Sequence, residues 1–158
     1  MTTATTSARP AALAVDEGAA ERGWSHEPHD ADVRLRAWGP TSAAAFEEAA
    51  TAMTAAVCDP RRVRARSAVR ISCTAPDPEL LLVEWLNAVV YEMATRGMVF
   101  GRFDVVIDDH RLQAIAWGEA LDRARHRPAA EVKGATYTAL QVGRRDDGTW
   151  VAACVVDV

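Results

Sequence analysis

The stretch Asp77–Gly97, DPELLLVEWLNAVVYEMATRG, specifies a long helix with a signal at each end. Asp77 is a favourable N-cap, and Pro78 suits the first helical position because its φ is already helical and its missing N–H would have had no partner there. Gly97 follows the pattern, where helices commonly end in a left-handed residue. Five large apolar residues recur at helical spacing between these ends: Leu82, Trp85, Leu86, Val89 and Met93. We therefore expect an amphipathic helix with its apolar stripe against the core.

The residues upstream of this helix predict a strand, a first helix and a second strand. Residues 33–38 alternate, with Val33, Leu35 and Ala37 on one face, and Gly39-Pro40 ends this strand. Thr41 is suited to cap a helix over 42–57. The apolar positions of that helix are Phe46, Ala49, Ala50, Met53 and Val57. Residues 68–73 have the composition of the second strand.

The residues downstream predict two hairpins. Runs 103–107 and 111–117 form the first, and 132–142 with 150–156 form the second. A polar loop over 119–130 separates them. The predicted order is β-α-β-α-β-β-β-β, which defines a single α+β domain with two helices packed on a largely antiparallel sheet.

Length and composition bound the class of protein. With 158 residues the chain is long enough for one domain with a core. We expect 1–22, rich in Ala and Thr, to be a disordered tail and 23–158 to be the domain. No apolar run reaches the ~20 residues that a membrane span needs, and the N-terminus lacks the apolar region of a signal peptide.

The charges and the cysteines narrow the class further. A net charge of −4 argues against binding to nucleic acid through bulk charge, while a local basic patch stays open. Such a patch could form around Arg61, Arg62, Arg64, Arg66 and Arg70, although an arginine cluster of this kind is more often a soluble edge. The three widely spaced cysteines include no CxxC pair, which predicts reduced thiols and a cytoplasmic protein.

The segment His26–Asp32, HEPHDAD, contains five potential metal ligands in seven residues. Its imidazoles suit zinc, and its carboxylates suit a hard cation. Pro28 excludes the regular helix in which metalloprotease histidines align. The alternative is a solvated polar turn before a strand.

The last residues of the sequence suggest a second metal-binding arrangement. The final strand ends in Asp157, and the carboxylate of Val158 follows directly. Adjacent anions repel unless a positive group lies between them. Calcium or magnesium would suit this place if Asp32, at the start of the first strand, supplied a further carboxylate. The alternative is an exposed chain end with ordinary hydration.

Lysine usage draws attention to one more position. Of the 18 basic residues, 17 are arginine and one is Lys133. In the segment 131–137 alternation puts Glu131, Lys133 and Tyr137 on one face. This lysine either belongs to a cross-strand charge pair or is offered to a phosphate, a carboxylate or a partner protein.

Five segments together resemble the archease family. They are HDADVRLRAWG (29–39), AAFEEAATAM (44–53), LLVEWLNAVVYEMATRGMVF (81–100), HRPAAEVKGATYTALQV (126–142) and the terminal VVDV. The resemblance covers about residues 26–158, and the order and spacing of the segments make the combination specific.

The resemblance implies a protein that has no catalytic residues of its own. Archeases activate the GTP-dependent RNA ligase of tRNA splicing and RNA repair, by promoting its guanylylation and repeated turnover. Carried over to this sequence, the metal site comprises Asp32, Asp157 and Val158, with calcium as the usual ion. His29 and Lys133 would lie beside it and dock the ligase. RNA would be contacted through the ligase, and no DNA or membrane partner is implied.

This sequence departs from the family pattern at several positions, among them Pro28, where the family often has an acidic residue, and the additional His26. Asp30 stands where the family commonly has Thr, which adds a negative charge beside the site. Thr138 stands where many members have His, so a role for that His does not carry over. Two other functions stay open: a chaperone-like protein-binding module, and a self-sufficient metal-dependent hydrolase that uses HEPHDAD.

Overall fold

The computed structural model describes residues 21–158, so the predicted tail lies mostly outside the described residues. Arg22 is described, and its guanidinium forms 2.6 Å ion pairs with Glu47 and Glu48 on the first helix. Among residues 21–158, no helix is long and apolar enough to cross a membrane.

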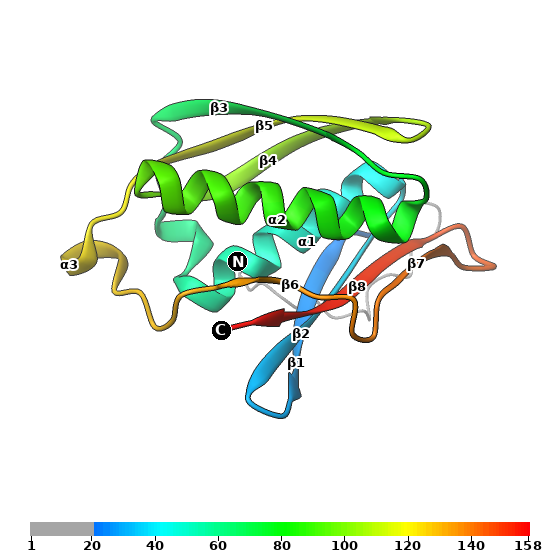
Figure 1. The fold of residues 1–158 in the computed structure, drawn as a ribbon, viewed down its shortest axis with the longest axis horizontal. Helices are drawn as coiled ribbons and strands as arrows, with labels where there is room; N and C mark the ends of the chain where they lie inside the picture. The colour runs from blue at the N-terminus through cyan, green and yellow to red at the C-terminus, as the bar shows by residue number, and fades with distance from the viewer. Residues whose placement is uncertain (1–20) are drawn as a thin grey trace.

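Two helices lie between two antiparallel sheets (Figure 1). The elements, in chain order, are β1 (Gly23–His29), β2 (Asp32–Gly39), α1 (Ser42–Val57), the 3-10 turn η2 (Pro60–Arg62), β3 (Ser67–Thr74), α2 (Pro78–Arg96), β4 (Met98–Asp108), β5 (Arg111–Ala120), α3 (Arg123–His126), β6 (Gly134–Ala135), β7 (Gln141–Arg144) and β8 (Trp150–Asp157). One sheet has the order β1-β2-β8-β6, with β7 also paired to β8, and the other has the order β3-β5-β4.

The predicted α+β class is confirmed, and so is the predicted order of the two long helices among antiparallel strands. The end signals of α2 act as expected. The side chain of Asp77 accepts a hydrogen bond from the Leu80 amide at 2.8 Å, and Gly97 adopts a φ of 64°. Thr41 caps α1 in the same way, through a 3.0 Å bond from the Ala44 amide.

The alternative in which HEPHDAD is a solvated turn before the first strand is wrong for most of the segment. Residues 23–29 form β1, which pairs with β2 along its whole length. The polar residues and Pro28 obscured this strand in the sequence. Because β1 is the edge strand of its sheet, a proline and polar side chains are tolerated there.

The predicted continuous strand over 132–142 is also wrong. The structure has two short strands, β6 and β7, which pair with opposite ends of β8. Between them the Thr136 amide and hydroxyl both donate to the Val155 carbonyl at 2.9 Å, and Ala139 has a φ of 51°. Local side-chain bonding and a left-handed residue therefore interrupt the ladder.

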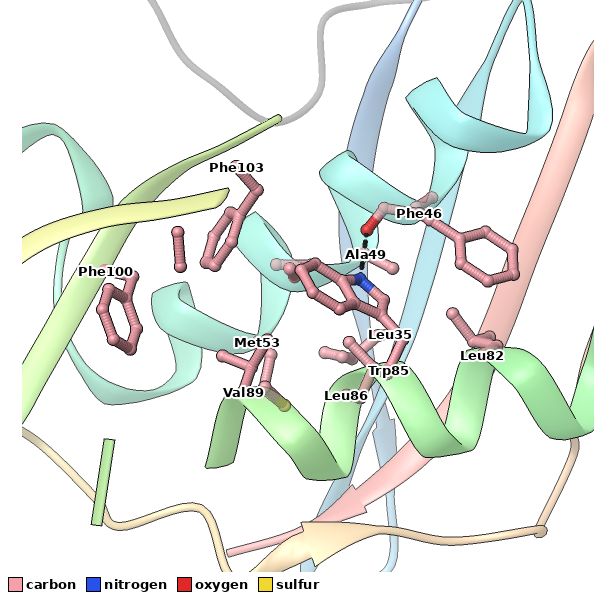
Figure 2. Packing of buried hydrophobic residues seen from close by; sticks show 14 of the residues in the cluster. Leu35, Phe46, Ala49, Met53, Leu82, Trp85, Leu86, Val89, Phe100 and Phe103 are labelled. Carbon is pink, nitrogen blue, oxygen red and sulfur yellow. Dashed lines mark hydrogen bonds between the residues drawn. The ribbon is translucent and has the colours of Figure 1, made fainter. Parts of the chain in front are cut away.

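The core is centred on Trp85 of α2, which is fully buried (Figure 2). Its indole N–H donates to the Phe46 carbonyl of α1 at 3.0 Å, and its ring meets Phe103 of β4 edge-on at 5.8 Å. The predicted stripe residues Leu82, Leu86 and Val89 are buried in the same cluster, whereas Met93 is half-buried at its border. One side chain thus joins both helices to the second sheet.

The three cysteines carry free thiols, in agreement with the prediction of reduced thiols. Cys58 and Cys154 are buried, and burial raises the pKa of the Cys154 thiol to about 12. That thiol stays protonated at neutral pH and packs as a small apolar group.

The region predicted as a polar loop over 119–130 contains a buried ionic network instead. Asp122 starts α3 by accepting bonds from the Ala124 and Arg125 amides. The Glu119 carboxylate accepts bonds from Arg125 Nη2 at 2.6 Å and from His126 Nε2 at 2.9 Å. Because His126 Nδ1 accepts from the Asp122 amide, the imidazole is neutral with its proton on Nε2.

We expect replacement of Trp85 to destabilise the protein, and the loss should be larger for alanine than for phenylalanine. Trp85→Phe removes the bond to the Phe46 carbonyl and should lower the free energy of unfolding by about 1–3 kcal/mol. Trp85→Ala also leaves a cavity and should cost about 3–5 kcal/mol. Urea denaturation measures both. Tyr91→Ala, at a 64% exposed position of the same helix, is the control, and an equal loss there would contradict the ranking.

Glu119 should make stability depend on acid pH. The Arg125 guanidinium, first among its partners, lowers the pKa of Glu119 from 4.5 to about 2. A carboxyl group whose pKa is lower in the folded state stabilises fully above its unfolded pKa, and this contribution is lost as pH falls from 4.5 towards about 2. In urea denaturation measured across this pH range, the free energy of unfolding should change less with pH for Glu119→Gln than for the wild type. Glu131→Gln, an exposed carboxylate, should leave the profile unchanged.

Candidate functional site

The start of β2 and the end of β8 meet at one corner of the first sheet (Figure 1). Val33 and Val156 are the last paired residues of these antiparallel strands, so Asp32 and Asp157 follow on facing chains. The Val158 amide donates to Asp32 Oδ1 at 3.3 Å. The structure therefore brings together the three residues that the resemblance implies as metal ligands.

Burial of β8 sets the register of this corner. Every residue from Val151 to Val156 is buried, because β8 lies between β2 on one side and β6 with β7 on the other. A shift of one residue would exchange the two faces of the strand, which the apolar surroundings resist. Asp157 is the first exposed residue after this run, and Asp32 is half-buried.

Lys133 reaches the corner through backbone contacts. Its amide donates to the Asp157 carbonyl at 2.8 Å, and Gly134 pairs with Asp157 in the ladder. The Lys133 side chain is exposed. Glu131, Lys133 and Tyr137 are exposed and Val132 is buried, as the alternation predicted, but the regular strand is limited to Gly134–Ala135.

Asn87 of α2 holds the Lys133 segment in place. Its Oδ1 accepts from the Ala135 amide at 2.8 Å, and its Nδ2 donates to the Ala135 carbonyl at 3.4 Å. Sequence reasoning missed this residue. Its signal was an asparagine in the middle of a long helix, where the residue has low intrinsic propensity.

His29 lies on the other side of Asp32. These two residues form the last pair of the β1–β2 hairpin, with Asp30 and Ala31 in the turn. Asp30 has a φ of 55°, a conformation in which aspartate is enriched among non-glycine residues. The departure at position 30 therefore suits the turn, besides adding a negative charge beside Asp32.

The remaining ligands of HEPHDAD have other partners. His26 Nε2 is 2.7 Å from the Ala52 carbonyl and therefore donates to α1, while its ring packs against Trp24. Glu27 forms a 2.9 Å ion pair with Arg34 of β2. His26 and Glu27 therefore make structural contacts, while His29 and Asp32 lie at the corner.

The corner offers hard oxygen donors. The second oxygen of Asp32, the Asp157 carboxylate and the Val158 carboxylate fit a divalent cation such as calcium, which prefers carboxylate and carbonyl oxygens. Within residues 21–158, no three His, Cys, Asp or Glu side chains lie close enough together to hold a metal. A site here would therefore need a third donor besides Asp32 and Asp157, and Val158 is the residue that the resemblance implies for it.

No basic side chain within the described range forms an ion pair with the carboxylates of Asp32 and Asp157. The ion pairs formed by residues 21–158 include neither Asp32 nor Asp157. Two carboxylates on facing strands repel each other, so a cation would be favoured there.

Known proteins similar to this chain agree on one family. The model of the Archease protein family (MTH1598/TM1083) matches residues 24–158. Protein archease of Pyrococcus furiosus is 34% identical over 141 residues, which cover 87% of this chain and 99% of the relative. Protein archease of Aeropyrum pernix is 36% identical over 141 residues, which cover 86% and 97%.

Solved structures agree as well. The solution structure of Methanobacterium thermoautotrophicum protein 1598 superposes with a TM-score of 0.76 at 29% identity, over 86% of this chain and 99% of that one. A Thermotoga maritima crystal structure, described as an archease and possible chaperone, has a TM-score of 0.56 at 16% identity, over 84% and 96%, and shows the shared fold.

The fold and the corner thus define a small α+β protein with an acidic site at the end of its central strand. The chain belongs to the archease family.

Replacement of Asn87 should loosen the segment that carries Lys133. In Asn87→Ala the Ala135 amide loses its acceptor, so its hydrogen exchange should become faster, while amides in the middle of β8 keep their protection. Exchange followed by NMR measures both. Glu84→Ala, at an exposed position of the same helix, should leave the Ala135 amide unchanged.

Proposed function

We propose that this protein is a metal-binding accessory protein that activates a GTP-dependent RNA ligase. It would promote guanylylation and repeated turnover of that ligase in tRNA splicing or RNA repair, in the cytoplasm. The observation that carries the proposal is the convergence of Asp32, Asp157 and Val158 at one exposed corner in a chain of the archease family. The protein would supply no catalytic residue of its own.

The corner would hold a divalent cation, with calcium as the proposed ion. Asp32 is already oriented by the Val158 amide, so one carboxylate oxygen is fixed and the other is left for a ligand. When bound, the cation would neutralise the carboxylates and offer a positive charge to an anionic partner group.

The surroundings of the corner would dock the ligase. His29 lies at the hairpin end beside Asp32, and the exposed Lys133 side chain extends from a segment bonded to Asp157. Their position beside the carboxylates suits recognition of an acidic or phosphorylated surface. Docking would favour the ligase conformation in which GTP and the nucleophile react, that is, a shift of population.

A chaperone-like role is the second candidate, favoured by the description of the Thermotoga maritima archease as a possible chaperone. In that role the protein would bind unfolded or partly folded partners. Suppression of a partner's aggregation would then be equal in the wild type and in Asp32→Asn, because no metal corner is involved.

The activator proposal predicts a charge-specific loss. With the cognate ligase and GTP, the wild type should accelerate guanylylation. Asp32→Asn and Asp157→Asn should lose most of this effect, and their calcium affinity in calorimetry should fall at least by the roughly 10–100-fold that outer-shell changes cost in metal sites. Asparagine keeps the size of the side chain and, at position 32, an acceptor for the Val158 amide.

Asp146→Asn is the matched control, since it removes the same charge from an exposed turn residue and should behave like the wild type. If Asp32→Asn activates the ligase normally, the corner is not the site on which activation depends. Absence of activation by the wild type, with a competent ligase, would rule out the activator role. Phosphoester hydrolysis by this protein alone would instead support the hydrolase.

A further inference from the structure

Tertiary structure joins two arginine-rich segments that are far apart in the sequence. One is the connection before β3, with Arg61, Arg62, Arg64 and Arg66, and the other is α3 with its cap, with Arg123, Arg125 and Arg127. We call these seven residues the arginine end. The second segment was predicted as a loop, so the sequence showed only half of this cluster.

Three contacts fix the segments to each other. Arg125 Nη1 donates to the Arg62 carbonyl at 2.9 Å, and the Arg64 amide donates to Glu119 Oε2 at 2.9 Å. The same carboxylate binds Arg125 at 2.6 Å. Glu119 is 6% exposed, so the link between the two segments is made inside the protein, and their outer side chains stay available.

The acidic residues of these segments are already engaged. Between 59 and 66 the carboxylate is Asp59, which pairs with Arg61 at 3.0 Å. Between 119 and 127 they are Glu119, bound as above, and Asp122, whose side chain caps α3. Seven guanidinium groups therefore face three carboxylates, each of which has an internal partner.

Four arginines of the arginine end have no carboxylate partner within residues 21–158: Arg62, Arg64, Arg123 and Arg127. All four are exposed. Glu131 borders the same hollow as Arg123, and no ion pair joins them. α3, which carries Arg123, forms the left end of the ribbon in Figure 1.

We propose that the arginine end binds the phosphate backbone of RNA. Guanidinium groups donate pairs of hydrogen bonds to phosphate oxygens, and a fixed array reduces the cost of ordering them. The choice of RNA rather than DNA rests on the proposed function. The overall charge of −4 means that binding would depend on this end and not on bulk charge.

The composition of the arginine end favours a nucleic acid over an acidic protein. Protein interfaces have an apolar, aromatic-rich centre, whereas nucleic-acid interfaces are polar and strongly positive. The exposed large hydrophobic residues in the described part of the chain are Tyr91, Val106 and Tyr137, and none lies in either segment. The two segments thus present charge for phosphate and no exposed large apolar side chain, although Arg123 borders a hollow lined mostly by apolar residues.

Fluorescence anisotropy with a labelled 20-nucleotide RNA, without ligase, tests the proposal. Four phosphate contacts predict a slope of about −2.8 for log affinity against log salt, which is a roughly fifty-fold loss between about 50 and 200 mM. The triple variant Arg62→Glu, Arg64→Glu, Arg123→Glu should bind at least about tenfold more weakly, with a slope near −0.7. Arg127 is left unchanged because its φ is 51°.

The matched control is Arg70→Glu, Arg111→Glu, Arg144→Glu, which makes the same change of charge at exposed arginines outside the arginine end. It should keep the RNA affinity of the wild type to within about twofold, and thermal unfolding checks both triple variants. Equal loss in the two triples, or no RNA binding by the wild type at low salt, would overturn the proposal.

Guanylylation measured without RNA separates this proposal from the proposed function. The arginine-end triple should activate the ligase like the wild type, while Asp157→Asn should bind RNA normally. If the triple loses activation but keeps RNA affinity, the arginine end contacts protein and the RNA assignment is wrong. Normal RNA binding together with failed activation by the wild type would refute only the activator role.

Discussion

The pairing of β8 between β2 and the short strands β6 and β7 is the constraint on which the rest of the structure depends. Six consecutive residues of β8 are buried, so its backbone groups need partners on both sides and its register cannot slip without exposing apolar surface. That register brings Asp157 opposite Asp32 and brings the Lys133 amide to the Asp157 carbonyl. The candidate site is thus the place where a tightly held strand emerges into solvent.

The two long helices connect the first sheet to the second through buried contacts. Trp85 bonds to the backbone of α1 and packs against Phe103, so α1, α2 and β4 share one buried side chain. Asn87, two residues further along α2, bonds to the backbone of Ala135. A single helix therefore contributes both to the core and to the position of the segment beside the corner, through opposite faces.

Two exposed ends of the protein have opposite charge, and each depends on a buried neighbour. The corner gathers carboxylates because two strand ends coincide there, and the arginine end gathers guanidinium groups because Glu119 binds both of its segments. Burial holds the Glu119 carboxylate among its donors, and those donors keep its pKa low, so it stays ionised. Under the two proposals, the acidic corner would contact the ligase and the basic end would contact RNA.

The sequence by itself determined the two long helices, the apolar faces of the strands and the α+β class, because caps and hydrophobic periodicity act over a few residues. It also carried the resemblance that named Asp32, Asp157 and Val158. It did not reveal β1, the break between β6 and β7, or the partners of His26 and Glu27, because these depend on contacts between distant residues. The tertiary structure decided which charged groups meet. The register of β8 brings Val158 to Asp32, 126 positions away in the sequence, and the buried Glu119 carboxylate joins the two arginine segments. No local sequence pattern encodes either contact.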